Sequence, residues 1–567
     1  MPSWLARCKT LCWGLSWGLC WSLWSLGCAA HGSADLILVG GQVLQFDRPA
    51  VQGLAIQGER IVALGSDADM RALAGPQTRV VALQGRTVIP GLIDSHIHAI
   101  RAGLTEMTEV SWIGATSVQD GLDRLRQAAR HQPAGTWLVV AGGWVEQQFT
   151  EQRRPTLQEL SQVSAEHPIY LQWAYSGVLF SPLGLEKSGL LQQAELASRL
   201  NTERDAQGHE TGWLLGTART VSDVYNLLPR PTRRAQEQGV LRFFQKLSAL
   251  GVTGVIDPGG YNLPMETYEP LQSVWRNQGL PVRVAFSLSA PRRGHELEDF
   301  STLTALLPMG MGNSTLKFNG LGENVTWGMY NNEKPTAQDE AHLQQVLMWA
   351  ASRRLGVTFH WNTEENVAHL LRVLEAVHAQ LPLTDLRWSI AHLNNASGQT
   401  LARMKAMNIG WLVQNASYYQ HPQFEKKYGT QAQQIPPIAQ ALRLGLHVGA
   451  GTDAHRVMDY NPFVALQWMV DGRTVDGRAT RTGEQLLPRL QALSLYTRGS
   501  AWFAHDDAQR GEIKPGYLAD LAVLDQDFLT MPDNQIHSLR SLLTLVGGQV
   551  MHATGPYAQL LSANSTP

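Results

Sequence analysis

Hydrophobic and polar residues alternate in short runs near both ends of the chain. From residue 35 to residue 88 these runs are separated by tight turns such as Gly40-Gly41, which is the pattern of β-strands in a small sheet. The hexapeptide Leu-Val-Gly-Gly-Gln-Val occurs at residues 38–43 and again at residues 545–550. Chance or shared turn chemistry could produce this recurrence. Two β-rich ends around a different middle nevertheless favour one composite β-sandwich domain, built from residues 35–88 and 505–560.

The middle of the chain has a longer period, in which helix-like runs lead into short apolar strands. Helices are expected at residues 236–250, 338–354, 363–379, 397–407 and 434–444. A strand is expected after each of them, at residues 252–256, 357–360, 386–392, 409–414 and 446–451. Repeated helix–strand units imply parallel strands with right-handed crossovers. The predicted fold class is therefore α/β, with a (β/α)8 TIM barrel over residues 89–504.

One stretch of the predicted barrel holds more strands than the barrel can use. Between His98 and Lys317 the strand candidates lie at residues 137–141, 168–172, 252–256 and 282–288. Only two of the eight barrel positions remain for them. We therefore expect an inserted subdomain at about residues 105–235, covering the mouth of the barrel.

The N-terminus has the composition of a targeting segment. Arg7 and Lys9 precede an apolar run from Leu11 to Ala30, interrupted mainly by serines and glycines. A basic start, an apolar segment and small residues are typical of a secretory signal peptide. Residues 1–34 therefore predict an exported protein, periplasmic or secreted. Lipoprotein attachment at Cys28 and an uncleaved membrane anchor remain alternatives.

Charge and cysteine usage exclude several classes of partner and site. The chain has 46 Lys and Arg residues against 48 Asp and Glu residues, so nothing argues for a nucleic acid or an anionic membrane surface as partner. We expect a small-molecule substrate and membrane contact only through the N-terminal segment, and a homo-oligomer stays open. The cysteines all lie in the leader, at Cys8, Cys12, Cys20 and Cys28. The rest of the chain therefore has no disulfide, no thiolate metal site and no cysteine nucleophile.

The most informative motif is the run from Val88 to His98, which reads Val-Ile-Pro-Gly-Leu-Ile-Asp-Ser-His-Ile-His. Side chains two apart on a strand point to the same face, so His96 and His98 are expected to project together, with Asp94 on that face. A bare His-x-His pair is more often a pair of surface histidines. This pair ends a hydrophobic strand, which favours a half-site for zinc or a similar divalent ion.

Other polar residues occupy the ends of predicted strands further along the chain. His360 ends Val-Thr-Phe-His, His392 ends Trp-Ser-Ile-Ala-His, and Asp453 follows Val-Gly-Ala-Gly-Thr. Lys317 lies within Thr-Leu-Lys-Phe-Asn-Gly, before a glycine-rich turn. Each residue has an ordinary explanation in packing, helix capping or contact with water. Because functional residues of such barrels sit at the C-terminal ends of strands, the whole series favours a metal centre.

The chain resembles the amidohydrolase superfamily, and most closely its amidohydrolase-3 or YtcJ-like branch. The resemblance rests on Pro90–His98, which looks like the first-strand metal motif, and on Gly511–Asp525, which looks like the C-terminal signature. It implies metal ligands on strands one, five and six, at His96, His98, His360 and His392. It also implies that Asp453 on strand eight is both a metal ligand and the proton shuttle. Lys317 matches the strand-four lysine, a metal ligand that can be carboxylated.

The resemblance implies a metal-dependent amidohydrolase that cleaves an amide or other C–N bond with metal-activated hydroxide, and the N-terminal segment predicts that it is exported. The cofactor would be one or two Zn²⁺ ions: a carboxylated Lys317 would bridge two ions, whereas an unmodified amine favours a mononuclear site. Hydrolysis of esters or lactones at the same site is one alternative, and a catalytically silent barrel that binds or regulates is another. His455, two residues after Asp453, is either a substrate contact or a loop residue bonded to nearby backbone.

The chain departs from close relatives in that family at three places. It has no histidine near Tyr175-Ser176-Gly177, and it has Asn319-Gly320 after the strand-four lysine, where Asp-Gly is usual. It also has Trp361-Asn362-Thr363 after the strand-five histidine, where a Gly-Asp is usual. These changes leave the implied metal ligands intact but leave the substrate open.

Overall fold

The computed structural model describes residues 33–260 and 264–562. Most of the predicted leader (residues 1–34), including all its cysteines, lies outside the described residues. Export and membrane attachment therefore stay predictions. In the part of the chain that the structure describes, every helix is too short or too polar to span a lipid bilayer.

Within the described residues, eight parallel strands in chain order form the centre of the molecule. One sheet consists of β7 (Leu92–Asp94), β13 (Val252–Asp257), β14 (Arg283–Leu288) and β15 (Leu316–Leu321). The other consists of β16 (Thr358–Trp361), β17 (Ser389–His392), β18 (Gly410–Val413) and β19 (Val448–Ala450). A parallel bridge joins Leu321 to Val357, and the Ser95 amide donates to the Ala450 carbonyl at 3.1 Å. Contacts on both edges therefore close the two sheets into a barrel.

Helices pack around this barrel where the sequence predicts them. They include α8 (Arg233–Ser248), α11 (Ala337–Ser352), α12 (Val367–Gln380), α13 (Gly398–Ala406) and α16 (Ile438–Arg443). The hydroxyls of Thr232 and Thr336 cap α8 and α11 by accepting an N–H of the first turn, as hydroxyl residues at this position commonly do. The inward face of α8 has the spacing of an amphipathic helix, with Val240, Phe243, Phe244 and Leu247 buried.

Two further sheets pack together, one with strands from both ends of the described chain and the other with amino-terminal strands alone. One sheet has the order β2 (Gln42–Val43), β6 (Thr87–Pro90), β20 (Leu521–Leu524), β21 (Ser541–Val546) and β22 (Gln549–Ala553). The other has the order β4 (Arg60–Gly65), β3 (Gly53–Gln57), β1 (Ala34–Val39) and β5 (Ala74–Ala82). Their shared core contains Leu38 and Leu54 together with Leu521 and Leu543. This arrangement is consistent with the predicted composite β-sandwich.

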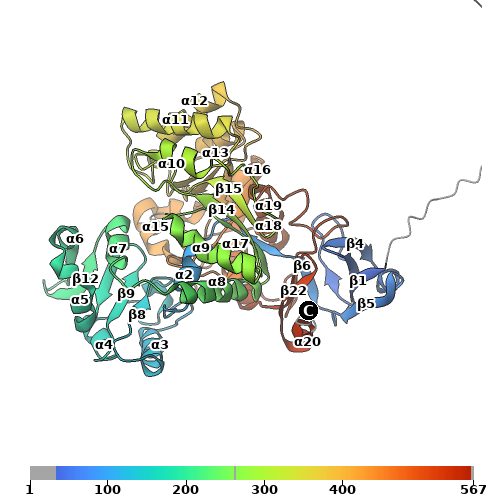
Figure 1. Ribbon diagram of the computed structural model, residues 1–567, viewed down its shortest axis with the longest axis horizontal. Coiled ribbons are helices and arrows are strands. Elements are labelled where there is room, and N and C mark those ends of the chain that lie inside the picture. Colours follow the sequence, from blue (N-terminus) through green and yellow to red (C-terminus); the bar gives the residue numbers. More distant parts are fainter. Residues whose placement is uncertain (1–32, 261–263, 563–567) are drawn as a thin grey trace, which may run out of the picture.

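The segment between α2 (Ala99–Thr105) and α8 forms a separate sheet. Its strand order is β11 (Asn201–Arg204), β12 (Glu210–Leu215), β10 (Gly177–Phe180), β9 (Ile169–Trp173) and β8 (Leu138–Val140). The first two strand candidates of this stretch are therefore β8 and β9 of this inserted sheet, and the other two are barrel strands β13 and β14. Figure 1 shows the inserted sheet and the composite sandwich on opposite sides of the barrel.

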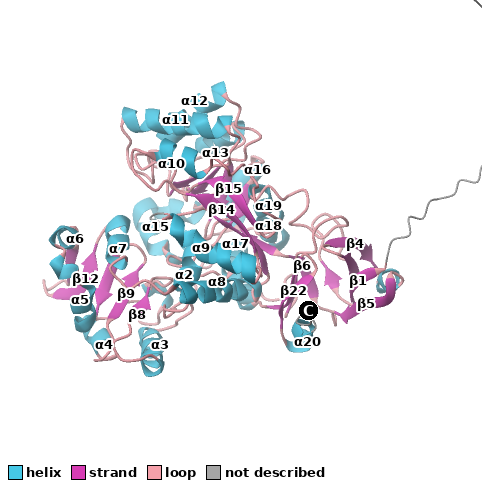
Figure 2. Cartoon of the chain, in the orientation of Figure 1, coloured by secondary structure: helices cyan, strands magenta, loops and turns pink. Residues whose placement is uncertain are grey.

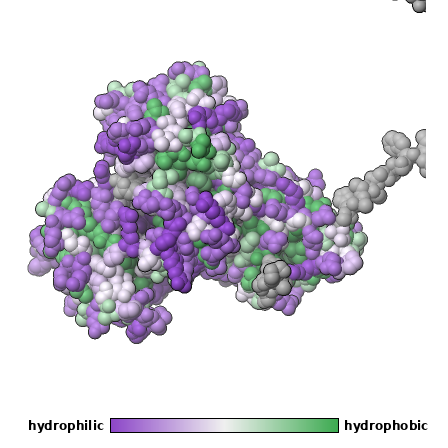
Figure 3. All heavy atoms as spheres, viewed as in Figure 1, coloured by the Kyte–Doolittle hydropathy of each residue, from purple (hydrophilic) through white to green (hydrophobic). Residues whose placement is uncertain are grey.

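Helices cover the outside of the central strands and flank the inserted sheet, whereas the composite sandwich consists mostly of strands (Figure 2). Hydrophilic side chains cover most of this face of the molecule, and hydrophobic side chains form smaller patches between them (Figure 3). The predicted histidines do not belong to this surface. His96 and His98, for example, are buried.

Candidate metal centre

The loop after β7 brings His96 and His98 together at the C-terminal end of the barrel. Since β7 ends at Asp94, the two histidines follow the strand instead of lying on it, and Asp94 does not join them. The Asp94 carboxylate accepts the backbone N–H of His96 at 3.1 Å and the hydroxyl of Thr452 at 2.6 Å. Asp94 thereby ties the end of β7 to the loop that carries Asp453.

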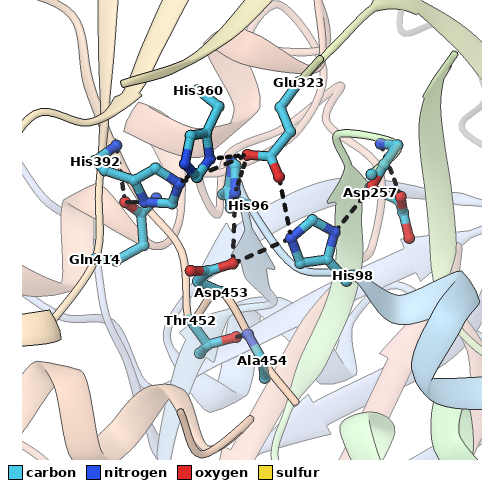
Figure 4. A network of polar contacts seen from close by, with 12 residues as sticks. His96, His98, Asp257, Glu323, His360, His392, Gln414, Thr452, Asp453 and Ala454 are labelled. Atoms are coloured by element: carbon cyan, nitrogen blue, oxygen red, sulfur yellow. Dashed lines mark hydrogen bonds and ion pairs between the residues drawn. The ribbon is translucent and has the colours of Figure 1, made fainter. Parts of the chain in front are cut away.

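Glu323, which the sequence analysis did not single out, lies among these histidines (Figure 4). It follows the end of β15 by two residues, and its side chain is only 5 % exposed. Its Oε2 lies 2.9 Å from His360 Nδ1 and 3.3 Å from His96 Nε2. Its Oε1 lies 3.5 Å from His98 Nε2. The two carboxylate oxygens therefore face different histidines.

His360 and His392 complete the set of imidazoles. His360 is the third residue of β16 and His392 is the last residue of β17. His392 Nε2 lies 2.9 Å from His360 Nδ1 and 3.6 Å from Glu323 Oε2. Two neighbouring strands thus deliver both rings to the same carboxylate.

Two oxygen acceptors determine which nitrogen of a histidine faces the centre. His392 Nδ1 lies 2.9 Å from Gln414 Oε1, which also accepts the His392 backbone N–H at 3.0 Å. His98 Nδ1 lies 2.9 Å from the carbonyl oxygen of Gly259. Because these oxygens can only accept, Nδ1–H donates in both cases. The Nε2 atom of each ring then presents its lone pair to the centre, as in metal-binding histidines.

Asp453 lies three residues beyond β19 and faces the histidines of the β7 loop. Its Oδ1 lies 3.2 Å from His98 Nε2 and 3.7 Å from His96 Nε2. The φ angles of Asp453 and His392 are +52° and +67°, in the left-handed region that residues with a side chain rarely adopt. Such conformations persist where the surrounding structure holds a residue in place, often at functional sites.

Lys317 does not join the other five predicted ligands. It is the second residue of β15, so it lies at the opposite end of the strand from Glu323. The four strand residues that follow it span about 13 Å of extended chain, which keeps its side chain away from the centre. Its Nζ lies 2.6 Å from Asp506 Oδ1. The prediction of a carboxylated Lys317 ligand is therefore wrong, because the amine forms an ion pair at the other end of the barrel.

Comparison with known proteins identifies the family. A model of the Amidohydrolase family matches residues 79–552. The chain belongs to this family. It is 25 % identical over 542 residues to the protein LONG AFTER FAR-RED 3 of Arabidopsis thaliana, covering 92 % of both chains. It is 22 % identical over 503 residues to the amidohydrolase YtcJ of Bacillus subtilis (strain 168), covering 84 % of this chain and 91 % of that one. The predicted resemblance to the YtcJ-like branch is thus confirmed.

A third relative and two solved structures extend this picture of the amidohydrolase. The chain is 23 % identical over 549 residues to the N-substituted formamide deformylase of Arthrobacter pascens, covering 91 % of this chain and 97 % of that one. A metal-dependent hydrolase from Pyrococcus horikoshii OT3 matches with a TM-score of 0.63 and 19 % identity, over 88 % of this chain and 99 % of that one. An adenosine deaminase from Xanthomonas campestris with bound zinc matches with a TM-score of 0.54 and 14 % identity, over 94 % and 97 %. At these identities the structures establish the α/β fold of TIM-barrel hydrolases.

The charges at this end of the amidohydrolase barrel are arranged for a cation. Burial tends to raise the pKa of Glu323, but His360 and two further histidines outweigh burial and hold that pKa well below its ordinary value. Burial also tends to raise the pKa of Asp453, but the surrounding imidazoles, chiefly that of His98, outweigh burial and lower it. Both carboxylates are therefore ionised at neutral pH. Burial lowers the pKa of His96, which favours the neutral ring that binds metals.

The donor set of the amidohydrolase fits a divalent metal ion. Two overlapping triads have ligand atoms within 4.8 Å of one another: His96, His98 and Asp453, and His96, Glu323 and His392. Both ring nitrogens of His96 are buried without a hydrogen-bond partner among the described residues. Within the same part of the chain, no lysine or arginine forms an ion pair with Glu323 or Asp453. Nitrogen lone pairs and carboxylates gathered in this way suit zinc or a similar ion.

His455 lies beside the centre but outside both triads. Its Nε2 is 3.1 Å from Glu109 Oε2, and Glu109 Oε1 accepts the hydroxyl of Tyr225 at 2.9 Å. The expected bond to nearby backbone is therefore replaced by a contact with a carboxylate from the segment after α2. A direct substrate contact by His455 stays a prediction.

Proposed function

We propose that this amidohydrolase is a metal-dependent hydrolase that cleaves an amide or other C–N bond of a small molecule, with zinc as the divalent ion. The observation that carries the proposal is the convergence of four histidines and two carboxylates at the C-terminal ends of the barrel strands. The similarity to a protein named N-substituted formamide deformylase supports the bond class. The zinc in the adenosine deaminase that shares the fold supports the choice of metal.

The ion would be held by residues from five barrel strands or their loops, namely His96, His98, Glu323, His360, His392 and Asp453. When bound, it supplies a hydroxide at neutral pH and polarises the carbonyl group of the substrate. Glu323 directs one oxygen to His98 and the other to the remaining histidines, so its carboxylate reaches both triads. This arrangement allows one or two ions without a modified lysine.

Asp453 is the group that can move protons. Its carboxylate is ionised and its side chain is 15 % exposed, so it can be reached from the mouth of the barrel. The carboxylate can accept a proton from the attacking water and donate it to the leaving nitrogen, first as general base and then as general acid. The backbone fixes its place, since the Asp453 N–H donates to the His96 carbonyl at 2.8 Å.

The substitution Asp453→Asn tests this proposal. We expect the turnover of N-formyl and N-acetyl amides to fall roughly 100- to 10,000-fold, the range of general acid–base catalysis. Bound zinc, measured by elemental analysis, should stay largely intact because five ligands remain. Chelation should abolish the activity of the wild-type protein, and added zinc should restore it. Full activity of the variant would refute the shuttle, and a metal-free, inactive wild-type protein in zinc-supplemented assays would favour a binding role.

A further inference from the structure

Arg456 is a buried cation at the mouth of the barrel, three residues beyond Asp453. It is 6 % exposed. Among the described residues its guanidinium forms no hydrogen bond or ion pair, and its Nε atom is buried without a partner. A guanidinium carries five N–H donors, and burying even one of them without an acceptor is unfavourable. Arg456 therefore has no directly bonded acceptor among the described residues.

The surroundings of Arg456 cover one face of its guanidinium with an aromatic ring. Its Cζ lies 3.9 Å from the centroid of the Tyr225 ring, so the ring covers one face of the cation. The nearby carboxylate of Glu109 is engaged by the Tyr225 hydroxyl and by His455. Since the N–H groups lie in the guanidinium plane, they can receive the two oxygens of a planar anion.

The inserted subdomain holds the backbone of Arg456 in place. The Gly143 N–H donates to the Arg456 carbonyl at 2.6 Å. Gly142 has a φ of +117°, and a Cβ atom there would lie 2.1 Å from the same oxygen, so only glycine permits this approach. Three residues of chain span at most about 11 Å, which keeps Arg456 close to Asp453.

A second arginine and a tyrosine connect Arg456 with the metal centre. Arg101 of α2 lies three residues beyond His98, and its Nε is also buried without a partner among the described residues. Both arginines interact electrostatically with His455. Tyr175 lies near enough to both Arg456 and Tyr330 to affect their pKa values. The Tyr330 ring stacks on a ligand of the centre at 4.8 Å, that of His360.

We propose that Arg456 binds a carboxylate of the substrate, so that the enzyme selects amides bearing an anionic group, such as N-acylated amino acids. This inference rests on the proposed function, because it names the substrate class of the same site. A guanidinium binds a carboxylate through two parallel charge-assisted hydrogen bonds. Arg456 would thereby set the distance between the carboxylate and the bond that is cleaved.

Two matched substrates test the proposal. N-acetylphenylalanine and N-acetylphenylalaninamide differ in the carboxylate, and acetate release is measured for both. We expect the wild-type protein to prefer the acid. Arg456→Met should lower the acid-to-amide ratio of kcat/KM roughly 10- to 100-fold, mainly through KM, and Arg456→Lys should restore part of the ratio. The matched control is Arg219→Met, since Arg219 is an exposed arginine 5.9 Å from the Trp327 ring centroid, and it should keep the wild-type ratio.

A binding measurement separates this inference from the proposed hydrolysis. In zinc-loaded Asp453→Asn protein, calorimetric titration should show N-acetylphenylalanine binding more tightly than its carboxamide, and Arg456→Met should remove the difference. Equal binding of acid and amide, or unchanged acid binding in the Arg456 variants, would overturn the inference. Arg456-dependent binding without hydrolysis by the wild-type protein would overturn the proposed function alone. Melting curves verify folding, and Arg456→Lys replaces Arg456→Met if the latter does not fold.

Discussion

Two clusters of buried charge lie at opposite ends of the barrel, and they use different residue types. The C-terminal cluster consists of four imidazoles and two carboxylates. At the other end, Arg283 is the first residue of β14 and Lys317 is the second residue of β15, and they bind Asp520 and Asp506 respectively. Arg510 binds both of these acids. In the second cluster each acid is therefore paired with two basic side chains, whereas the first cluster presents lone pairs and carboxylates that no lysine or arginine of the described residues pairs with.

The basic partners of the carboxylates explain why one cluster has a structural role and the other can bind a metal or exchange protons. The Asp520 carboxylate accepts from Arg283 at 2.8 and 3.0 Å, from Arg510 at 2.9 Å and from the Gly547 amide at 2.8 Å. Arginine stays protonated, so an acid held in this way cannot bind a metal or exchange a proton. Histidine has an ordinary pKa close to neutral pH, so an imidazole can give up its proton and offer a lone pair. A buried carboxylate therefore indicates an active site when its partners are histidines, and not when they are arginines.

The largest effect is expected from removing the carboxylate that the histidines share. Glu323→Gln preserves the shape of the side chain but removes its charge. We expect at least a 100-fold loss of zinc affinity, since even outer groups that orient ligands contribute 10- to 100-fold, and hydrolysis should fall accordingly. Elemental analysis after dialysis against a weak chelator measures the loss. Zinc retained at the wild-type level would remove Glu323 from the ligand set.

The corresponding change at the other end should affect stability and leave the metal alone. Asp520→Asn leaves the buried guanidinium of Arg283 without its paired carboxylate and removes one of the two acids that bind Arg510. This is expected to lower the free energy of unfolding by about 3–5 kcal/mol. Denaturant unfolding measures this cost. Zinc content and turnover per folded molecule should stay at wild-type values. A loss of zinc without a loss of stability would contradict the division between the two clusters.

Low pH should weaken the ion pairs that Asp520 forms with Arg283 and Arg510. Burial tends to raise the pKa of Asp520, but Arg510 and Arg283 outweigh burial and lower it. A lowered pKa contributes stability that is present above the unfolded-state pKa of about 3.9 and is lost as the pH falls through the folded-state pKa. The melting temperature should therefore drop below about pH 4. Asp520→Asn should weaken the dependence of the melting temperature on pH. The same drop in melting temperature with acid in variant and wild type would contradict the role of Asp520.

The smallest effect is expected at Lys317. Lys317→Met removes one partner of Asp506, which keeps its bond to Arg510 at 3.1 Å. We expect a cost of about 1–2 kcal/mol, typical of a hydrogen bond to a charged group, with zinc content and activity unchanged. The melting temperature and zinc content are measured for this variant and for Glu323→Gln. The two variants change residues at opposite ends of β15. Loss of zinc in the Lys317 variant would restore that residue as a ligand.

The sequence predicted the barrel and five of the converging residues because periodicity identifies strands and because functional side chains gather where strands end. It did not predict the right residue of the fourth strand, since the pattern around Lys317 does not say where that strand stops. The strand continues to Leu321, which places Lys317 at its start and Glu323 two residues past its end. His96 likewise lies two residues past the end of β7. A search for a possible ligand two residues past each strand end could therefore have found Glu323.

Contacts that orient the ligands could not be predicted from local patterns. Asp94 was expected on the face of the histidines, but it binds Thr452, which is 358 residues away in the chain. Nothing in the sequence around Gln414 indicates its role, which depends on its contact with His392 in the folded structure. Such partners depend on how distant loops meet, and only the three-dimensional arrangement specifies them.

The composite sandwich imposes an order on the biosynthesis of this enzyme. β6 and β20 are hydrogen-bonded neighbours, and Pro90 pairs with Leu521. At roughly 5–20 residues per second, a ribosome releases these two residues about 20–90 s apart. Throughout that interval the amino-terminal strands have an open edge, of the kind that invites pairing with other chains. A nascent chain that stops inside the barrel therefore has β2 and β6 but lacks β20, β21 and β22. Synthesis of these last strands covers the open edge of β6 and thereby lowers the risk of aggregation.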